Sequence, residues 1–281
     1  MVELFDFCLF NLSFLRIFPV TSVFRLFLSV SSPKPHTPSN MFKTSLLAAF
    51  AAMTCAASAA TISINFTEAA DRVNQNLPSG TAAGIGGLTN WNNVDANPDG
   101  TFGSLVDNSG SGTAASVTWS AQGGGVWGDN TATTDANAGV GDAMLRRGYI
   151  DDNGGDAFSS VTFSVSGIAY ATYDVVVYYS SGDGTNPQLQ ATNINGTEMS
   201  PDPAAGANNQ YGTNPNWDAT NTVTFSSLSG ASFSGFTVDR NTVGTGRASI
   251  AGLQIVEIIP EPSSAALLGL GGLALILRRR K

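Results

Sequence analysis

The chain has 281 residues, a formal net charge of −8, 31 glycines and only 12% charged residues, which is unlike the composition of an ordinary helical cytosolic enzyme. Residues 61–259 hold 18 of the 21 acidic residues and five of the 13 basic ones, so their net charge is −13, and they contain no lysine, cysteine or histidine. This excludes thiol nucleophiles, histidine-containing zinc sites and a Ser-His-Asp triad from the segment, and its negative charge disfavours nucleic acid as a partner.

Residues 1–40 contain an apolar run that Arg16, Pro19 and Arg25 divide into short pieces. Each piece is too short to span a bilayer. A second apolar run also has no evident use upstream of the export signal described next. We therefore interpret residues 1–40 as an extension from a start site assigned too early, with Met41 as the true start. The alternative is an N-terminal membrane anchor.

Residues 41–60 have the layout of a secretory signal peptide. Lys43 supplies the positive start, residues 45–53 are apolar, and Ala57-Ser58-Ala59 is an A-x-A cleavage signal. We expect the mature chain to begin at Ala60 or Thr61, just after Ala59 or Ala60. A buried core helix and a lipobox around Cys55 are the alternatives.

Residues 61–259 show short β-branched or aromatic runs separated by Gly, Asn, Asp and Ser clusters, which predicts strands and turns with almost no helix. Two segments, DNSG at 107–110 and SGDG at 181–184, consist of turn-forming residues, which accept positive φ. The eight predicted strands are 61–66, 115–120, 160–167, 173–180, 189–194, 221–228, 232–238 and 248–259.

The run YDVVVYYS at 173–180 is apolar on both faces. Tyr173, Val175, Val177 and Tyr179 alternate onto one face, and Val176 and Tyr178 lie on the other, which is typical of a strand inside a sheet. About eight strands over this length predict an all-β fold, a β-sandwich or jelly roll. FSVSGIAYATYDVVVYY followed by IAGLQIVE resembles the jelly-roll, broadly galactose-binding-like modules of secreted bacterial proteins.

Two acidic loops are candidate calcium sites. Asp95, Asn97 and Asp99 lie in D-x-N-x-D-G, the opening half of a calcium loop, but Val106 stands where the bidentate acid should be. The second loop carries Asp151, Asp152 and Asp156, whose close carboxylates would repel unless they are solvated or bridged by a cation. A structural Ca²⁺ is the only cofactor the sequence raises, and turns rich in Asn and Asp are the alternative.

Four tryptophans could stack on a sugar or pack the interior. Trp119 lies in a predicted strand, so we expect it in the core. Trp91, Trp127 and Trp217 lie in loops rich in Asn and Gly, so either ligand contact or loop packing is open for them. The few glutamates of the domain have no recognisable catalytic context. We therefore expect no enzyme activity.

The last 22 residues form a distinct tail. Pro260, Glu261 and Pro262 precede the apolar run 263–277, which measures about 22 Å as a helix and is short for a bilayer core of about 30 Å. The basic residues that follow should stay cytoplasmic and stop translocation. They are Arg278, Arg279, Arg280 and Lys281. We predict a short transmembrane helix here.

These three parts, in this order at the terminus, resemble a PEP-CTERM sorting signal over residues 260–281. The resemblance implies recognition by exosortase, a membrane transpeptidase, in a Gram-negative bacterium that often makes exopolysaccharide. The chain is then an inner-membrane intermediate before it reaches the cell surface or the extracellular matrix. We expect a secreted, non-catalytic protein; a carbohydrate-binding module or carbohydrate-active enzyme delivered by the same route is the alternative.

Overall fold

The structure is a computed structural model of the chain. It describes residues 58–67, 76–95, 99–121, 125–128, 140–152, 160–180, 190–201, 217–239 and 248–260. The chain divides into two compact units, Met1–Ala56 and Ala57–Lys281, and every described residue belongs to the second. The expected extension, most of the signal peptide and the tail beyond Pro260 therefore lie outside the described residues. No helix within these ranges is long and apolar enough to cross a membrane.

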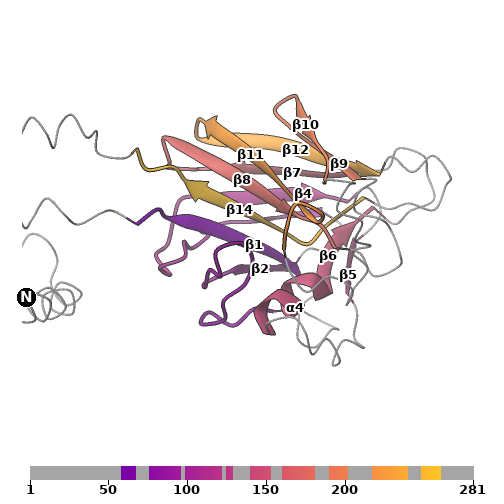
Figure 1. The fold of residues 1–281 in the computed structure, drawn as a ribbon, viewed down its shortest axis with the longest axis horizontal. Helices are drawn as coiled ribbons and strands as arrows, with labels where there is room; N and C mark the ends of the chain where they lie inside the picture. The colour runs from indigo at the N-terminus through magenta and orange to yellow at the C-terminus, as the bar shows by residue number, and fades with distance from the viewer. Residues whose placement is uncertain are drawn as a thin grey trace, which may run out of the picture. The chain divides into compact units, whose positions relative to one another are not determined.

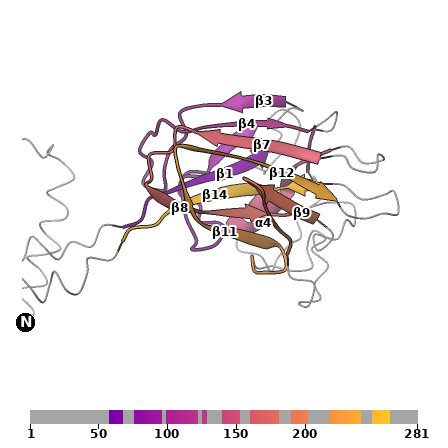
Figure 2. The ribbon, with the colours of Figure 1, turned by 90° about the horizontal axis from the view of Figure 1, so that it is seen from above.

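Two antiparallel-rich sheets face each other, as Figures 1 and 2 show, which confirms the all-β sandwich expected from the sequence. The five-stranded sheet has the order β11 (Thr222–Ser229), β8 (Thr172–Tyr178), β14 (Gly252–Glu257), β1 (Thr61–Thr67), β2 (Asn92–Asp95). The six-stranded sheet has the order β10 (Thr197–Met199), β9 (Gln190–Ile194), β12 (Ser232–Asp239), β7 (Ser160–Ser166), β4 (Ser116–Ser120), β3 (Asp99–Phe102).

The main core lies between these two sheets. In β7 the buried residues alternate with partly exposed ones, so Val161, Phe163 and Val165 face inward. Phe163 meets Phe233 of β12 edge to face, with 6.4 Å between the ring centroids. Trp119 joins the same core, as expected from the sequence. Apolar burial between the sheets is therefore the main stabilising term of the fold.

Strand β8 is buried on both faces, as the sequence predicts. Tyr173, Val175 and Val177 belong to the core between the sheets. Val176 and Tyr178 belong to a second apolar cluster on the other face of the same sheet. The strand lies between β11 and β14, which is an interior position. A strand with apolar residues at consecutive positions needs cover on both sides, and this fold supplies it.

The cover on the second face comes from elements that the sequence analysis did not predict. They are the loop 76–91, the helix α4 (Val140–Arg147) and Tyr149 of the strand β6 (Gly148–Asp151). The strand β6 is the middle of a three-stranded sheet, between β13 (Ser249–Ile250) and β5 (Gly125–Gly128). Leu145 of α4 and Trp91 pack here. The Gly84 amide donates to Asp142 Oδ1 at 2.7 Å, which joins the loop to the helix.

The first and last strands of the domain are neighbours. Strand β1 pairs antiparallel with β14, with Thr61 opposite Val256. The Glu257 amide donates to the Ala60 carbonyl at 2.9 Å. The start of β1 and the end of β14 therefore lie side by side at one end of the sandwich (Figure 1).

Candidate functional site

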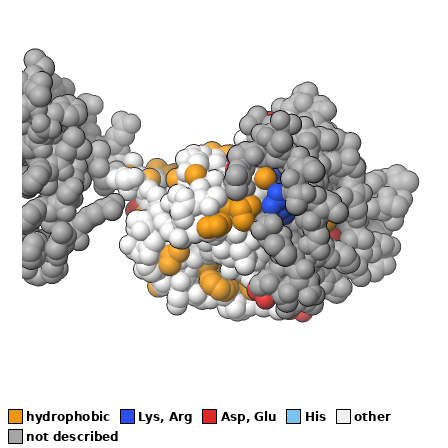
Figure 3. All heavy atoms as spheres, turned by 90° about the horizontal axis from the view of Figure 1, so that it is seen from below, with side chains coloured by type: hydrophobic (Ala, Val, Ile, Leu, Met, Phe, Trp, Pro, Cys, Tyr) orange, Lys and Arg blue, Asp and Glu red, His pale blue; other side chains and the backbone are white. Residues whose placement is uncertain are grey.

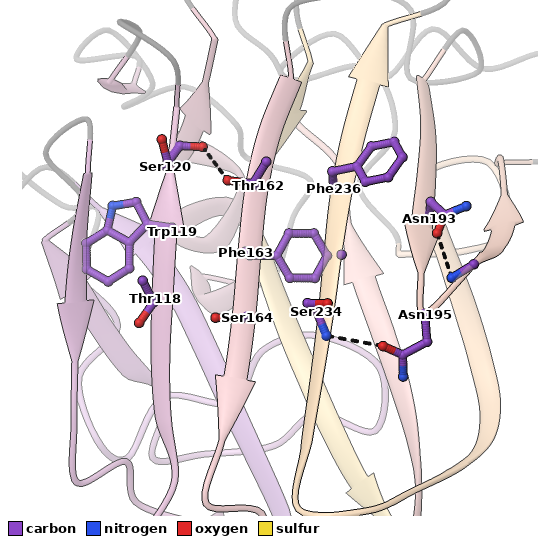
Figure 4. A pocket seen from close by; sticks show the side chains of 12 residues that line it. Thr118, Trp119, Ser120, Thr162, Phe163, Ser164, Asn193, Asn195, Ser234 and Phe236 are labelled. Carbon is purple, nitrogen blue, oxygen red and sulfur yellow. Dashed lines mark hydrogen bonds between the residues drawn. The ribbon is translucent and has the colours of Figure 1, made fainter.

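A hollow of about 540 Å³ lies on the outer face of the six-stranded sheet (Figure 4). It extends over β4, β7 and β12 to the turn between β9 and β10. Hydroxyl and amide side chains dominate its lining, with one exposed phenylalanine. The lining residues are Thr118, Trp119, Ser120, Thr162, Phe163, Ser164, Asn193, Asn195, Gly196, Ser234, Gly235 and Phe236.

The polar character of this face follows from strand alternation and register. In each strand the residues between the buried ones point away from the core. The register aligns them in rows: Ser120 lies opposite Thr162, and Thr162 lies opposite Phe236, which in turn lies opposite Asn193. A second row aligns Thr118 with residues 164 and 234. An antiparallel sheet with one face on the core presents such rows to solvent.

Phe236 is the unusual residue of this face. Its side chain is 40% exposed, although its neighbours across the strands are polar. Figure 4 shows its ring beside Asn193. A ring in this position offers an apolar surface within reach of hydrogen-bonding groups, which is the usual composition of a small-molecule site.

The two asparagines are held by the turn between β9 and β10. The Gly196 amide donates to Asn193 Oδ1 at 2.9 Å, and the Ser234 amide donates to Asn195 Oδ1 at 3.3 Å. Asn195 has a φ of 51°, a left-handed conformation that asparagine tolerates in turns. Because both bonds use Oδ1, the Nδ2 groups are the ones that can donate to a ligand.

The hollow is electrically neutral. None of its twelve lining residues is ionisable. Acidic residues stand at the two ends of the row that contains Phe236: Asp99 pairs with Ser120, and Glu198 pairs with Asn193. Both acids are exposed. The arrangement can hydrogen-bond an uncharged polar ligand, and its lining contains no ionisable side chain that could act as a general acid or base.

The acidic residues proposed for calcium are spread over different elements. Asp95 ends β2 and Asp99 begins β3, both exposed, while Asn97 lies outside the described residues. Within the described part of the chain, no group of three His, Cys, Asp or Glu residues could hold a metal ion. The calcium site at 95–100 thus stays a prediction from the sequence.

The second acidic loop is partly internal. Asp151 and Asp152 are buried, with 0% and 3% of their surface exposed, and the Ala248 amide donates to Asp152 Oδ2 at 3.2 Å. The Asp152 carboxylate therefore connects the end of β6 to the segment that leads into β13. Asp156 lies outside the described residues.

Trp91 and Trp217 pack against the same ring, that of Tyr178. Trp91 meets Tyr178 edge to face at 5.8 Å, and Trp217 does so at 4.9 Å. Arg146 lies over the Trp217 ring at 4.6 Å. Trp91 is only 4% exposed, so its faces are occupied by protein and packing is its role. Trp217 is half-buried against the same cluster, and the side chain of Trp127 lies outside the described part.

Sequence reasoning missed Phe236, although the sequence contains a signal for it. In SFSGFTV, Phe233 and Phe236 are three positions apart. Residues at odd separations in a strand point to opposite faces. If Phe233 packs in the core, Phe236 must lie on the outer face, as the structure places it.

Viewed from below, the molecule shows a mostly neutral described surface with scattered hydrophobic atoms (Figure 3). Among the described residues, the basic side chains are Arg146 and Arg147, both in α4. The described surface therefore has no basic stripe of the kind that binds nucleic acid.

Comparison with known proteins identifies the tail. The family model described as "PEP-CTERM protein-sorting motif" matches residues 259–281, which confirms the sorting signal expected from the sequence. No curated protein matches the chain.

Two solved structures show a remote likeness. The "Crystal structure of plant Receptor-like Kinase FER" is 10% identical with a TM-score of 0.35, over 72% of this chain and 43% of that one. This chain thus spans less than half of that protein. "The structure of the family 32 CBM from C. perfringens NanJ in complex with galactose" is 24% identical with a TM-score of 0.25, over 50% of this chain and 93% of that one. Both TM-scores are too low to assign a ligand.

Proposed function

We propose that this chain is a non-catalytic protein of the cell surface or extracellular matrix, exported and then sorted through its C-terminal tail. The observation that carries the proposal is the PEP-CTERM motif at residues 259–281, which implies processing by the membrane enzyme exosortase and export through the membrane to the surface. The motif follows the last strand directly, because β14 ends at Glu257 and Pro260 is exposed.

The remaining steps belong to the proposal as well. Signal peptidase removes residues up to Ala59 or Ala60, and the basic residues from Arg278 onward hold the chain as an inner-membrane intermediate. The host is a Gram-negative cell, and its exosortase then acts at the Pro-Glu-Pro segment of the chain. The β-sandwich at 61–259 is the part that stays outside.

Two features support a non-catalytic sandwich. Residues 61–259 contain no cysteine or histidine, which are the usual nucleophile and general base of hydrolases. Glycoside hydrolysis needs two carboxyl groups on either side of the bond that breaks, and the hollow has none in its lining.

The proposal is tested by fractionation of the producing bacterium with and without its exosortase. We expect the chain at the surface or in the medium of the complete strain, and in the inner membrane of the deleted strain. Equal surface amounts in both strains would show that the tail is not a sorting signal.

Carbohydrate binding at the hollow is the second candidate function. The favouring observation is the exposed Phe236 ring within a row of Ser, Thr and Asn side chains. An aromatic ring can cover the apolar face of a pyranose while hydroxyls and amides bond its edges. Asp99 and Glu198 at the row ends would repel acidic polymers, so the candidate ligand is a neutral glycan.

This candidate is tested by co-sedimentation of the protein with insoluble neutral polysaccharides. Phe236→Ala should weaken retention about tenfold, because it removes the stacking surface. Ile85→Ala is the matched control, since Ile85 is similarly exposed at 43% and lies outside the hollow. Equal retention of both variants would exclude the hollow. Release of sugar fragments that one Asp or Glu substitution abolishes would instead favour an enzyme.

A further inference from the structure

The two processing points of this chain meet on neighbouring strands. The Ala60 amide nitrogen donates to Glu257 Oε2 at 3.1 Å, and the Glu257 amide donates to the Ala60 carbonyl at 2.9 Å. Ala60 follows the A-x-A signal directly, and Glu257 lies three residues before Pro260. The side chain of one strand thus faces the nitrogen that becomes the mature N-terminus if the signal peptide is cut after Ala59.

The surroundings of this contact are negative. Burial first, and then the charges of Asp107 and Glu257, raise the pKa of Tyr170 to about 12. Both carboxylates are therefore near the same tyrosine. The described basic residues, Arg146 and Arg147, belong to α4, which lies away from the start of β1 in both ribbon views (Figures 1 and 2). A positive charge at Ala60 would complement this end.

We propose that Glu257 is the receptor for the α-ammonium group of a mature N-terminus at Ala60. An ammonium group has three donors and a full charge, whereas the amide before cleavage has one donor and none. The contact therefore changes from an ordinary hydrogen bond to a charge-assisted one when the signal peptide is removed. Cleavage after Ala60 would instead place the charge at Thr61, whose nitrogen faces the neutral Asn108 Oδ1 at 3.0 Å.

The pair of Ala60 and Glu257, which we call the latch, lies where β1 begins and β14 ends. It joins β1 to β14 at the last rung, and the Ile258 amide continues the attachment by donating to the Thr172 carbonyl at 2.9 Å. Only residues 258 and 259 then separate the latched strand from Pro260. The latch determines where the folded domain ends and where the segment offered to the sorting enzyme begins.

The test uses the released, processed protein. Residues 60–260 contain no lysine, so the α-amino group is the one primary amine in that part of the chain, and acetylation caps it selectively. Intact mass counts the acetyl groups and N-terminal sequencing identifies the first residue. Thermal unfolding is then compared for the amine and acetylated forms of the wild type and of Glu257→Gln.

We expect Ala60 as the first residue. Acetylation should lower the melting temperature of the wild type by about 2–4 °C, the shift that one such pair gives in a domain of this size. It should leave Glu257→Gln unchanged, because the partner charge is already gone. Asp107→Asn is the matched control: it removes a neighbouring carboxylate but keeps Glu257, so acetylation should still lower its melting temperature.

The pH dependence has a defined direction. The titratable group that contacts the Ala60 nitrogen is Glu257 of β14, and Asp107 of the loop after β3 and Tyr170 of the segment before β8 belong to the same charged neighbourhood. The negative carboxylates favour the charged amine, so its pKa in the folded state should exceed the ordinary α-amino value of about 7.7–8.0. The stabilisation of the fold by the charged amine is then complete below the ordinary α-amino pKa, and it is lost as the pH rises through the raised pKa of the folded state.

Three results would overturn the proposal. One is a mature protein that does not begin at Ala60. Another is an acetylated wild type that melts at the same temperature as the amine form, which needs no variant to be folded. The third is an equal loss on acetylation in the wild type and in Glu257→Gln, because independent effects would mean that the two groups do not interact.

Discussion

Three hydroxyl groups form a buried chain beside the core between the sheets. Tyr179 and Thr192 share a hydrogen bond of 2.5 Å, and Thr192 shares another of 2.7 Å with Thr237. Burial raises the pKa of Tyr179 above its ordinary value, against a smaller opposing effect of Thr192, so the phenol stays protonated. Thr192 is the central member, because it contacts both of the others.

Replacing the central member should be more harmful than replacing the end. Thr192→Val removes both bonds and leaves two buried hydroxyls without this partner, so we expect a loss of about 1–3 kcal/mol in the free energy of unfolding. Tyr179→Phe removes one bond and leaves the Thr192–Thr237 pair, so we expect about 1 kcal/mol. Urea denaturation measures both; a larger loss for Tyr179→Phe would contradict the assignment of Thr192 as the centre.

Asp107 is held as an anion by the turn that the sequence predicts at 107–110. Partial burial alone would raise its pKa, but the Ser109 hydroxyl and the amides of Ser111, Ser109 and Gly110 lower it below the ordinary value. Gly110 has a φ of 81°, the positive value expected at this turn. The carboxylate thus organises the loop between β3 and β4.

This lowered pKa gives a pH prediction. A carboxyl group whose pKa falls on folding stabilises the fold above its unfolded pKa of about 3.9, and the effect is lost as the pH falls through the lower folded value. Melting temperatures measured from pH 6 to pH 2 should show wild type above Asp107→Asn at pH 6, with the gap closing below about pH 4. A gap that is constant over this range would mean that the charge of Asp107 has no role.

At the scale of elements, Gly252 lets β14 lie close to both its neighbour β1 and the helix α4. A Cβ at this position of β14 would lie 2.5 Å from the Ile64 carbonyl oxygen and 3.3 Å from Leu145 Cδ1. The first neighbour is backbone of β1, which cannot move without breaking the sheet. The glycine is therefore needed for close packing between β1, β14 and α4.

Gly252→Ala should lower the free energy of unfolding by about 1–3 kcal/mol, since overpacking forces neighbours to shift. Gly112→Ala is the matched control, because nothing lies within 4 Å of its Cβ position and its φ is not positive. Its change should stay within about 0.5 kcal/mol. Equal effects in urea denaturation would show that the contact with Ile64 does not limit packing.

All eight predicted segments contain strand, because β-branched and aromatic residues alternate within them and turn residues bound them. The last segment, 248–259, is divided at Ala251 into β13 and β14, which belong to different sheets. The missed strands are short or rich in Asn and Gly. In β2, for example, Asn92 bonds both the amide and the carbonyl of Val106, and Asn93 does the same for Leu77. Side-chain amides here replace backbone pairing, a tertiary effect that propensity does not contain.

Helix α4 was missed for a different reason. It has eight residues, about two turns, which is too short for a periodic apolar pattern to stand out. Its placement depends on packing: Leu145 and Met144 enter the second cluster, and Asp142 receives the Gly84 amide. The candidate hollow was missed likewise, since it depends on the register of four strands that lie far apart in sequence.

At the scale of the whole molecule, the C-terminal tail carries the sorting signal, and the β-sandwich is the part of the chain that is sorted. The tail was predictable because its three parts are contiguous: the Pro-Glu-Pro segment, an apolar run and a basic end. The two prolines predict an extended segment at 260–262 instead of regular helix, and we expect this segment to be the part that the enzyme meets. Replacing Pro260-Glu261-Pro262 by Ala-Ala-Ala should keep the membrane anchor and block its removal, whereas deletion of residues 278–281 should disturb retention and processing together.

The intact mass of the released protein, in a host that contains the sorting enzyme, tests the central claim most directly. The account predicts a released wild-type chain that has lost Leu267–Lys281, and a triple-alanine variant that stays in the membrane at full length. Release of a wild-type chain that still carries residues 267–281, or normal release of the triple-alanine variant, would contradict the sorting function and leave the tail as an anchor.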